Sequence, residues 1–124
     1  MRDHNQLRAF KLADEMAVLV YRLTQAFPAS EQFGLTNQMR RAAVSAASNI
    51  VEGCGRSSQK DYLHFLDMAL GSAREAGYQA SLAFRLGLLP KDSYRILDEH
   101  CNETSRTLCA LILAVRAPKS IKPQ

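Results

Sequence analysis

The stretch from Gly53 to Lys60 contains the residues best suited to hold a phosphate. Gly53, Cys54, Gly55 and Arg56 lie between two predicted helices, and Lys60 follows near the start of the second of these helices. Flexible glycines, a helix N-terminus and two cations can together bind a phosphate. The run is short and lacks the spacing of a nucleotide-binding P-loop, so a glycine helix end and a solvated turn are the simpler interpretation.

Arg95 and His100 form a second candidate site, with the residue types needed to cleave RNA. Histidine suits general base chemistry, and arginine can stabilise a crowded phosphate. Their spacing, early in the last predicted helix, resembles the motif of HEPN-type ribonucleases, in which paired Arg and His residues from two subunits cleave RNA without metal. However, Ile96 stands where that family usually has a polar residue, and this spacing is common by chance. We therefore expect no enzymatic activity, and a HEPN-like ribonuclease is the alternative.

The remaining histidines and the cysteines give no sign of a metal site. His4 and His64 have no partner at ligand spacing, and the three cysteines are Cys54, Cys101 and Cys109. An odd number of cysteines outside any ligand spacing indicates reduced thiols, which are typical of the cytoplasm. No run approaches the ~18 apolar residues of a membrane span, and no apolar leader follows the basic start. We expect a cytoplasmic protein without cofactor, metal or membrane segment.

The charge balance allows contact with nucleic acid but does not require it. The 124 residues include 16 basic and 12 acidic side chains, a net charge of +4, and the pI is near 9.2. Such a mild excess is also common on solvated surfaces. Aromatic residues are 7% and Trp is absent, so the sequence shows no aromatic and basic array for stacking bases. Four cations are the candidates for binding RNA or DNA: Arg40, Arg41, Arg56 and Lys60.

Few glycines and prolines, abundant alanine and 47% hydrophobic residues favour long helices. The apolar periodicity predicts one all-α domain over residues 1–124, an up-down-up-down four-helix bundle. Thr36 is the predicted N-cap of the second helix, and Ser58 begins a capping box at the third. The predicted helices span about 6–27, 37–52, 59–86 and 91–116, and the tail 117–124 is expected to fray.

Two of these helices carry a second patterned line of residues, in addition to the face that packs into the core of a monomer. Opposite its core face, the third helix carries a line at four- and three-residue steps: His64, Met68, Gly71, Glu75, Tyr78 and Leu82. The second helix is rich in small residues and carries a polar line: Arg41, Ser45, Ser48 and Glu52. These ten residues are candidates for a subunit interface, in which Gly71 allows close approach and Arg and Glu pair across subunits. Scattered surface apolar residues and a solvated polar edge are the alternative.

The second helix also carries a family signature. The runs that match are Phe33 to Ser45, Ser48 to Gly53, Gly55 to Ser58, Tyr62 to Leu66 before Asp67, and Ala69 to Ser72 with Glu75. They resemble the four-helix-bundle proteins encoded in bacterial 23S rRNA intervening sequences. The resemblance implies a homopentamer without known catalytic activity and with an unsettled function. The architecture is also similar to the accessory protein of diversity-generating retroelements, which is implicated in binding nucleic acid and a reverse transcriptase.

Together these observations predict a non-enzymatic, homo-oligomeric helical scaffold that contacts RNA or DNA through phosphates. A metal-independent ribonuclease using Arg95 and His100 is the first alternative. A purely protein–protein scaffold is the second. Salt-dependent RNA binding separates the scaffold that contacts nucleic acid from the one that does not.

Overall fold

The computed structural model describes residues 2–118, and these residues form four α-helices and no strand. The helices are α1 (Arg8–Thr24), α2 (Leu35–Cys54), α3 (Gln59–Arg85) and α4 (Lys91–Arg116), and two 3-10 turns are η1 (His4–Gln6) and η2 (Ala29–Glu31). The predicted all-α class is confirmed. Of the predicted frayed tail, Ala117 and Pro118 are not helical, and 119–124 lie outside the described residues.

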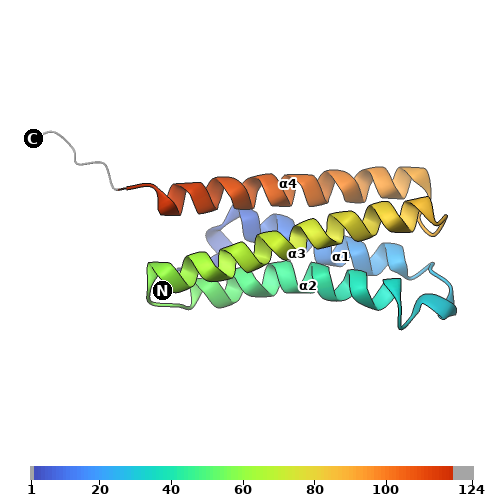
Figure 1. The fold of residues 1–124 in the computed structure, drawn as a ribbon, viewed down its shortest axis with the longest axis horizontal. Coiled ribbons are helices and arrows are strands. Elements are labelled where there is room, and N and C mark those ends of the chain that lie inside the picture. The colour runs from blue at the N-terminus through green and yellow to red at the C-terminus, as the bar shows by residue number, and fades with distance from the viewer. Residues whose placement is uncertain (1, 119–124) are drawn as a thin grey trace, which may run out of the picture.

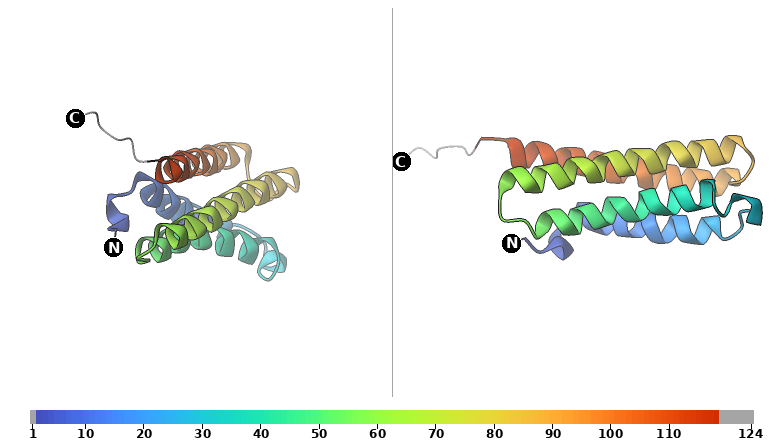
Figure 2. Two further views of the ribbon diagram at one scale, coloured as in Figure 1. Left: turned by 60° about the vertical axis from the view of Figure 1, so that its left-hand side comes forward. Right: turned by 60° about the horizontal axis from the view of Figure 1, so that its bottom comes forward.

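The four helices lie side by side along one long axis (Figures 1 and 2). Each helix packs against two neighbours: α1 and α3 each contact both α2 and α4. The α2–α3 pair is the most extensive of these contacts. None of the described helices is both long enough and apolar enough to cross a membrane.

The core is built from large apolar side chains and from alanines that let the helices approach closely. Eight alanines of α2 and α3 are fully or almost fully buried, and Thr104 is the most deeply buried polar residue among those described. The Thr104 hydroxyl donates to the backbone carbonyl of His100 at 2.7 Å, so its burial leaves no unpaired donor. The largest buried side chains are Met16 and Val20 of α1, Met39 and Ile50 of α2, Tyr62 and Leu66 of α3, and Leu97 and Leu108 of α4.

The start of α2 differs from the prediction. The helix begins at Leu35, Gly34 is its N-cap, and Thr36 lies inside the first turn. The predicted capping role of Thr36 is therefore wrong, and its buried hydroxyl has no hydrogen-bond partner. Instead, the backbone N–H of Leu35 donates to the carboxylate of Glu31 at 3.3 Å. A carboxylate from the preceding turn thus satisfies a free N–H group at this helix end.

The end of α2 also extends past the predicted residue 52. Gly53 is buried inside the helix, which runs to Cys54 and has Gly55 as its C-cap. A Cβ added to Gly53 would lie 2.9 Å from the Cβ of Phe65 and 3.3 Å from a ring carbon of Tyr62. Gly53 therefore does not end the helix. Because glycine has no Cβ, α2 can approach α3 at this point more closely than any other residue would permit.

The other boundaries agree more closely with the sequence. The α1 helix is shorter than predicted: Leu7 is extended and forms the N-cap, and the helix ends at Thr24 with Gln25 as the C-cap. The α3 and α4 boundaries match within a residue. The Ser58 hydroxyl accepts from the backbone N–H of Asp61 at 3.1 Å, which confirms its capping role. Pro90 is the N-cap of α4 and not part of its first turn.

Candidate functional site

The two lines of candidate interface residues lie on α2 and α3, which pack side by side. On α3, Tyr78 is 61% exposed and Met68 is 44% exposed, whereas Leu82 is half-buried against the core. Gly71 is exposed, and a Cβ added to it would meet no atom within 4 Å. The α3 line therefore presents large apolar side chains around a glycine on open surface.

A cleft of about 530 Å³ runs between α2 and α3. We call it the α2–α3 cleft. Three of the predicted interface residues, Arg41, Ser45 and Glu75, line it. Its other lining residues are Phe33, Asn37, Gln38, Ala42, Ser72 and Gln79. The volume lies in the range typical of ligand pockets.

One polar group at the floor of the α2–α3 cleft lacks a partner. Gln79 is only 6% exposed, and its amide oxygen is buried without a hydrogen bond. Nearby, the Ser45 and Ser72 hydroxyls lie 2.9 Å apart and link the two helices, and the Asn49 amide donates to the Ser45 hydroxyl at 3.0 Å. A buried acceptor without a partner costs about 1–3 kcal/mol. Gln79 is therefore the group in this cleft whose hydrogen bonding is incomplete in the isolated chain.

Phe33 stands at the rim of the same cleft and is 88% exposed. The sequence prediction did not select Phe33, Asn37 or Gln79 as site residues. Helical periodicity could not find Phe33, because it precedes α2 and belongs to no helix face. The available signal was an aromatic residue between polar loop residues and a glycine.

A second cleft, of about 290 Å³, lies on the other side of α3, against α4. We call it the α3–α4 cleft. Tyr78 lines this cleft and not the α2–α3 cleft. Its other lining residues are Ala73, Arg74, Gly77, Asp98, Cys101, Asn102 and Ser105. The exposed ring of Tyr78 and the incompletely bonded amide of Gln79 thus lie on different sides of one helix.

Two of the four candidate cations are already engaged inside the chain. The Arg40 guanidinium lies 4.5 Å from the centre of the Tyr21 ring and donates to the Thr24 hydroxyl at 2.9 Å. Arg56 pairs with the Glu52 carboxylate at 2.7 Å and lies over the Phe65 ring. Because Glu52 already pairs with Arg56 of the same chain, its pairing with an arginine of another subunit competes with an existing contact.

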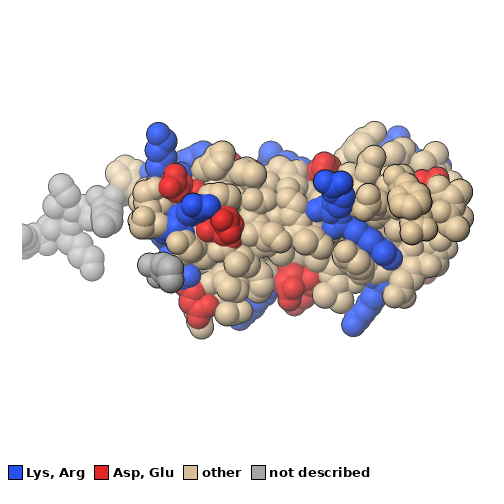
Figure 3. All heavy atoms as spheres, turned by 90° about the horizontal axis from the view of Figure 1, so that it is seen from below, with Lys and Arg blue, Asp and Glu red and all other residues tan. Residues whose placement is uncertain are grey.

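The other two cations, Arg41 and Lys60, are exposed and form no ion pair within residues 2–118. They lie on different helices, and Arg41 alone lines the α2–α3 cleft. The face drawn in Figure 3 carries Lys and Arg side chains at several separate places, with acidic and uncharged surface between them. The structure therefore does not gather the four candidate cations into one patch.

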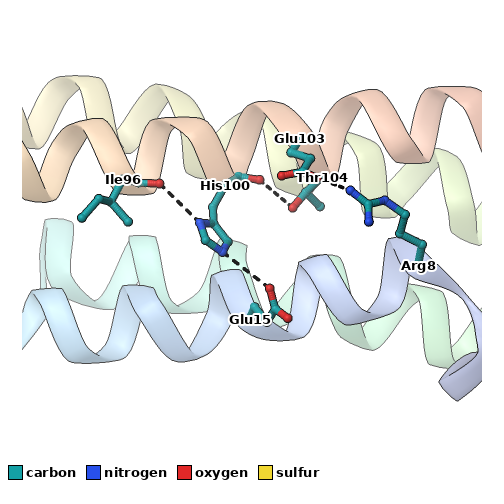
Figure 4. A network of polar contacts seen from close by, with 6 residues as sticks. All are labelled: Arg8, Glu15, Ile96, His100, Glu103 and Thr104. Atoms are coloured by element: carbon teal, nitrogen blue, oxygen red, sulfur yellow. Dashed lines mark hydrogen bonds and ion pairs between the residues drawn. The ribbon is translucent and has the colours of Figure 1, made fainter.

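The residues of the ribonuclease alternative are also kept apart. His100 faces α1, where its Nε2 lies 3.6 Å from the Glu15 carboxylate, and its Nδ1 lies 3.4 Å from the carbonyl of Ile96 (Figure 4). Arg95 is exposed and lies 3.9 Å from Asp92. The α1–α4 cleft beside His100 is lined by Arg22 and Ile96, not by Arg95. Within one chain, the Arg95 and His100 side chains do not converge on a common site.

The cysteines are free thiols, and two of them are buried. Burial raises the pKa of Cys101 from 9.0 to about 12, and it also raises the pKa of Cys54. A thiol with a raised pKa stays protonated at neutral pH and is a poor nucleophile. Among residues 2–118 there is no cluster of three His, Cys, Asp or Glu side chains that could hold a metal ion.

These features define a class of protein: an all-α four-helix bundle whose most distinctive surface is a polar cleft beside an exposed apolar line. The chain belongs to the 23S rRNA-intervening sequence protein family, whose sequence pattern matches residues 5–110. The match covers all of α1, α2 and α3 and most of α4.

Solved structures contain a similar fold. A protein of unknown function from the S23 ribosomal protein family of Bacteroides thetaiotaomicron superposes with a TM-score of 0.76. The two sequences are 23% identical, and the alignment covers 84% of this chain and 97% of the other. No curated protein matches this sequence.

Proposed function

We propose that this chain is an up-down-up-down subunit of a cytoplasmic homo-oligomer, a pentamer, and that the assembly is a scaffold without catalytic activity. The observation that carries the proposal is the surface made by the α3 line and the α2–α3 cleft. Tyr78 and Met68 are exposed on the α3 line, and Arg41 lines the cleft without an ion partner among the described residues. Tyr, Met and Arg are enriched in protein interfaces.

The small residues of this surface support the same function. Gly71 on α3 and Ser48 on α2 are exposed and leave little bulk between helices. A second helix can therefore approach closely, as in other tightly packed helical interfaces. The three free cysteines are compatible with a reducing compartment.

The assembly is tested by its mass. Light scattering at micromolar concentration should give several times the 13.8 kDa of one chain. Met68→Asp should reduce the mass to that of a monomer and leave the helical circular dichroism unchanged. Val18→Asp is the matched control, because Val18 on α1 is also 44% exposed but lies outside the candidate interface. A wild-type mass near 13.8 kDa would refute the proposal.

The scaffold is also proposed to bind RNA or DNA through phosphates, with Lys60 as its main contact. Lys60 forms no ion pair within residues 2–118 and does not line the α2–α3 cleft, so the assembly leaves it free for phosphate. An oligomer repeats each contact, and linked weak contacts gain strongly from effective concentration. Binding should be nearly independent of sequence and weaken steeply with salt, and Lys60→Ala should reduce the salt dependence. Binding that ignores salt contradicts this part of the proposal.

A further inference from the structure

We infer that the subunits join head to tail, with Tyr78 of one copy inserted into the α2–α3 cleft of the next. This inference rests on the proposed assembly and names its contact. The partner copy supplies the side chain that completes the cleft, and the cleft is incomplete without it.

The first argument is where the two parts of the contact lie. Tyr78 lines the α3–α4 cleft, whereas Gln79 lines the α2–α3 cleft on the flank of α3 that faces α2. A copy that inserts its Tyr78 into a neighbour therefore keeps its own α2–α3 cleft free for a third copy. An interface between two different surfaces is heterologous, and it closes into a ring when the rotation between copies allows.

The second argument is the chemical fit between the tyrosine and the cleft. Tyr78 is 61% exposed and combines a large apolar ring with a hydroxyl donor. The α2–α3 cleft offers about 530 Å³, an exposed Phe33 ring at its rim and the unpaired amide oxygen of Gln79 at its floor. The terminal torsion of a glutamine is broad, so a rotation of this amide turns its oxygen toward the cleft. The tyrosine hydroxyl can then donate to it.

The third argument is charge complementarity. The α2–α3 cleft has Arg41 and Glu75 as its charged residues, and the α3–α4 cleft has Arg74 and Asp98. None of these four side chains forms an ion pair in the described part of the chain. Each surface thus offers one cation and one anion, so the two surfaces can pair Arg41 with the partner's Asp98 and Glu75 with the partner's Arg74. Complementary charges of this kind fix the register of an interface.

The test uses two variants that each lack one half of the contact. Tyr78→Asp removes the inserted side chain, and Asn37→Trp blocks the cleft from an exposed lining position, so neither burdens the core. Each variant alone should have the 13.8 kDa mass of a monomer. An equal mixture should contain a heterodimer of twice that mass, because the intact cleft of one variant accepts the intact Tyr78 of the other. Circular dichroism checks that both variants are folded.

A second measurement is needed because the mixed variants form only a single contact, which can be too weak to detect by mass. In a Cys109→Ala background, Tyr78→Cys and Asn37→Cys chains are mixed and oxidised, and a covalent heterodimer is expected in excess over either homodimer. The inference is overturned when the mixture gives neither a heterodimer nor this cross-link, or when Asn37→Trp assembles like wild type. If Asn37→Trp assembles but loses RNA binding, the cleft takes nucleic acid and not a second copy. A monomeric wild-type protein instead refutes the proposed assembly itself.

Discussion

At the scale of the residue, the contacts of a side chain decide its role more than its type does. Gly53 and Gly71 both lie inside helices, yet only Gly53 has a neighbouring helix close to its missing Cβ. Arg40 and Arg41 are adjacent in sequence, yet Arg40 packs on Tyr21 while Arg41 lines the α2–α3 cleft. Predictions about these residues therefore depend on their neighbours in space.

Replacing Gly53 by alanine should destabilise the bundle. The new Cβ would lie 2.9 Å from the Cβ of Phe65, and such overpacking costs about 1–3 kcal/mol. The matched control is Gly77→Ala, whose Cβ would meet the Cβ of Cys101 at an ordinary 3.5 Å. Gly77→Ala should gain about 0.5–1 kcal/mol from helix propensity. Urea unfolding of both variants measures the difference, and equal stabilities would contradict the close approach of α2 and α3.

Cys101 should make the fold sensitive to alkaline pH. Burial raises its pKa to about 12 in the folded chain, against an ordinary value of 9.0. The contribution of the protonated Cys101 thiol to the stability of the fold is fully present below pH 9. It is lost as the pH rises toward 12, because only the thiol of the unfolded chain ionises in this range. The free energy of unfolding should fall by up to about 1.4 kcal/mol per pH unit from this group. Cys101→Ala should flatten that slope, whereas Cys109→Ala, at a half-buried thiol, is the control.

At the scale of the element, each helix end is stabilised by a different group. The Ser58 hydroxyl caps α3 directly, whereas α2 receives the carboxylate of Glu31 from the preceding turn. The contact between α2 and α3 combines the close approach at Gly53 with the hydroxyl pair of Ser45 and Ser72. Of these contacts, the hydroxyl pair of Ser45 and Ser72 lies in the wall of the α2–α3 cleft.

The two hydroxyls at these helix starts should respond differently to removal. Ser58→Ala removes a capping hydrogen bond and should cost about 1 kcal/mol of stability. Thr36→Val removes a buried hydroxyl that has no partner, so stability should be unchanged or slightly higher. Thermal unfolding of the two variants is the measurement. A loss of stability in Thr36→Val as large as in Ser58→Ala would show that Thr36 caps α2 after all.

At the scale of the whole molecule, the arrangement of α1 and α4 bears on catalysis. The His100 ring is held between the Glu15 carboxylate and a backbone carbonyl (Figure 4). Arg95 lies near Asp92 and does not line the cleft beside His100. A general base and a phosphate-binding arginine must reach the same substrate atoms. A ribonuclease site would therefore require the Arg95 of a second subunit beside His100.

We expect the protein to leave RNA intact. RNA incubated with excess protein in the presence of a chelator should show no cleavage above the buffer background, and His100→Ala should not alter this. Gel electrophoresis of a labelled RNA is the measurement. Cleavage by the wild type that disappears in both His100→Ala and Arg95→Ala would instead establish a metal-independent ribonuclease formed between subunits.

The sequence by itself determined the helices, because apolar periodicity, glycines and prolines act locally. It predicted the boundaries of α3 and α4 to within a residue and identified Ser58 as a cap. It also predicted that Met68 and Tyr78 lie on a second, exposed face of α3. Only the tertiary structure decided which side chains meet. It made Gly53 a contact point and not a helix end, engaged Arg40 and Arg56 within the chain, and brought Phe33 and Gln79 to one cleft although they lie on different segments. Those relations depend on helix packing, in which residues distant in sequence set the available space, and no local pattern contains that information.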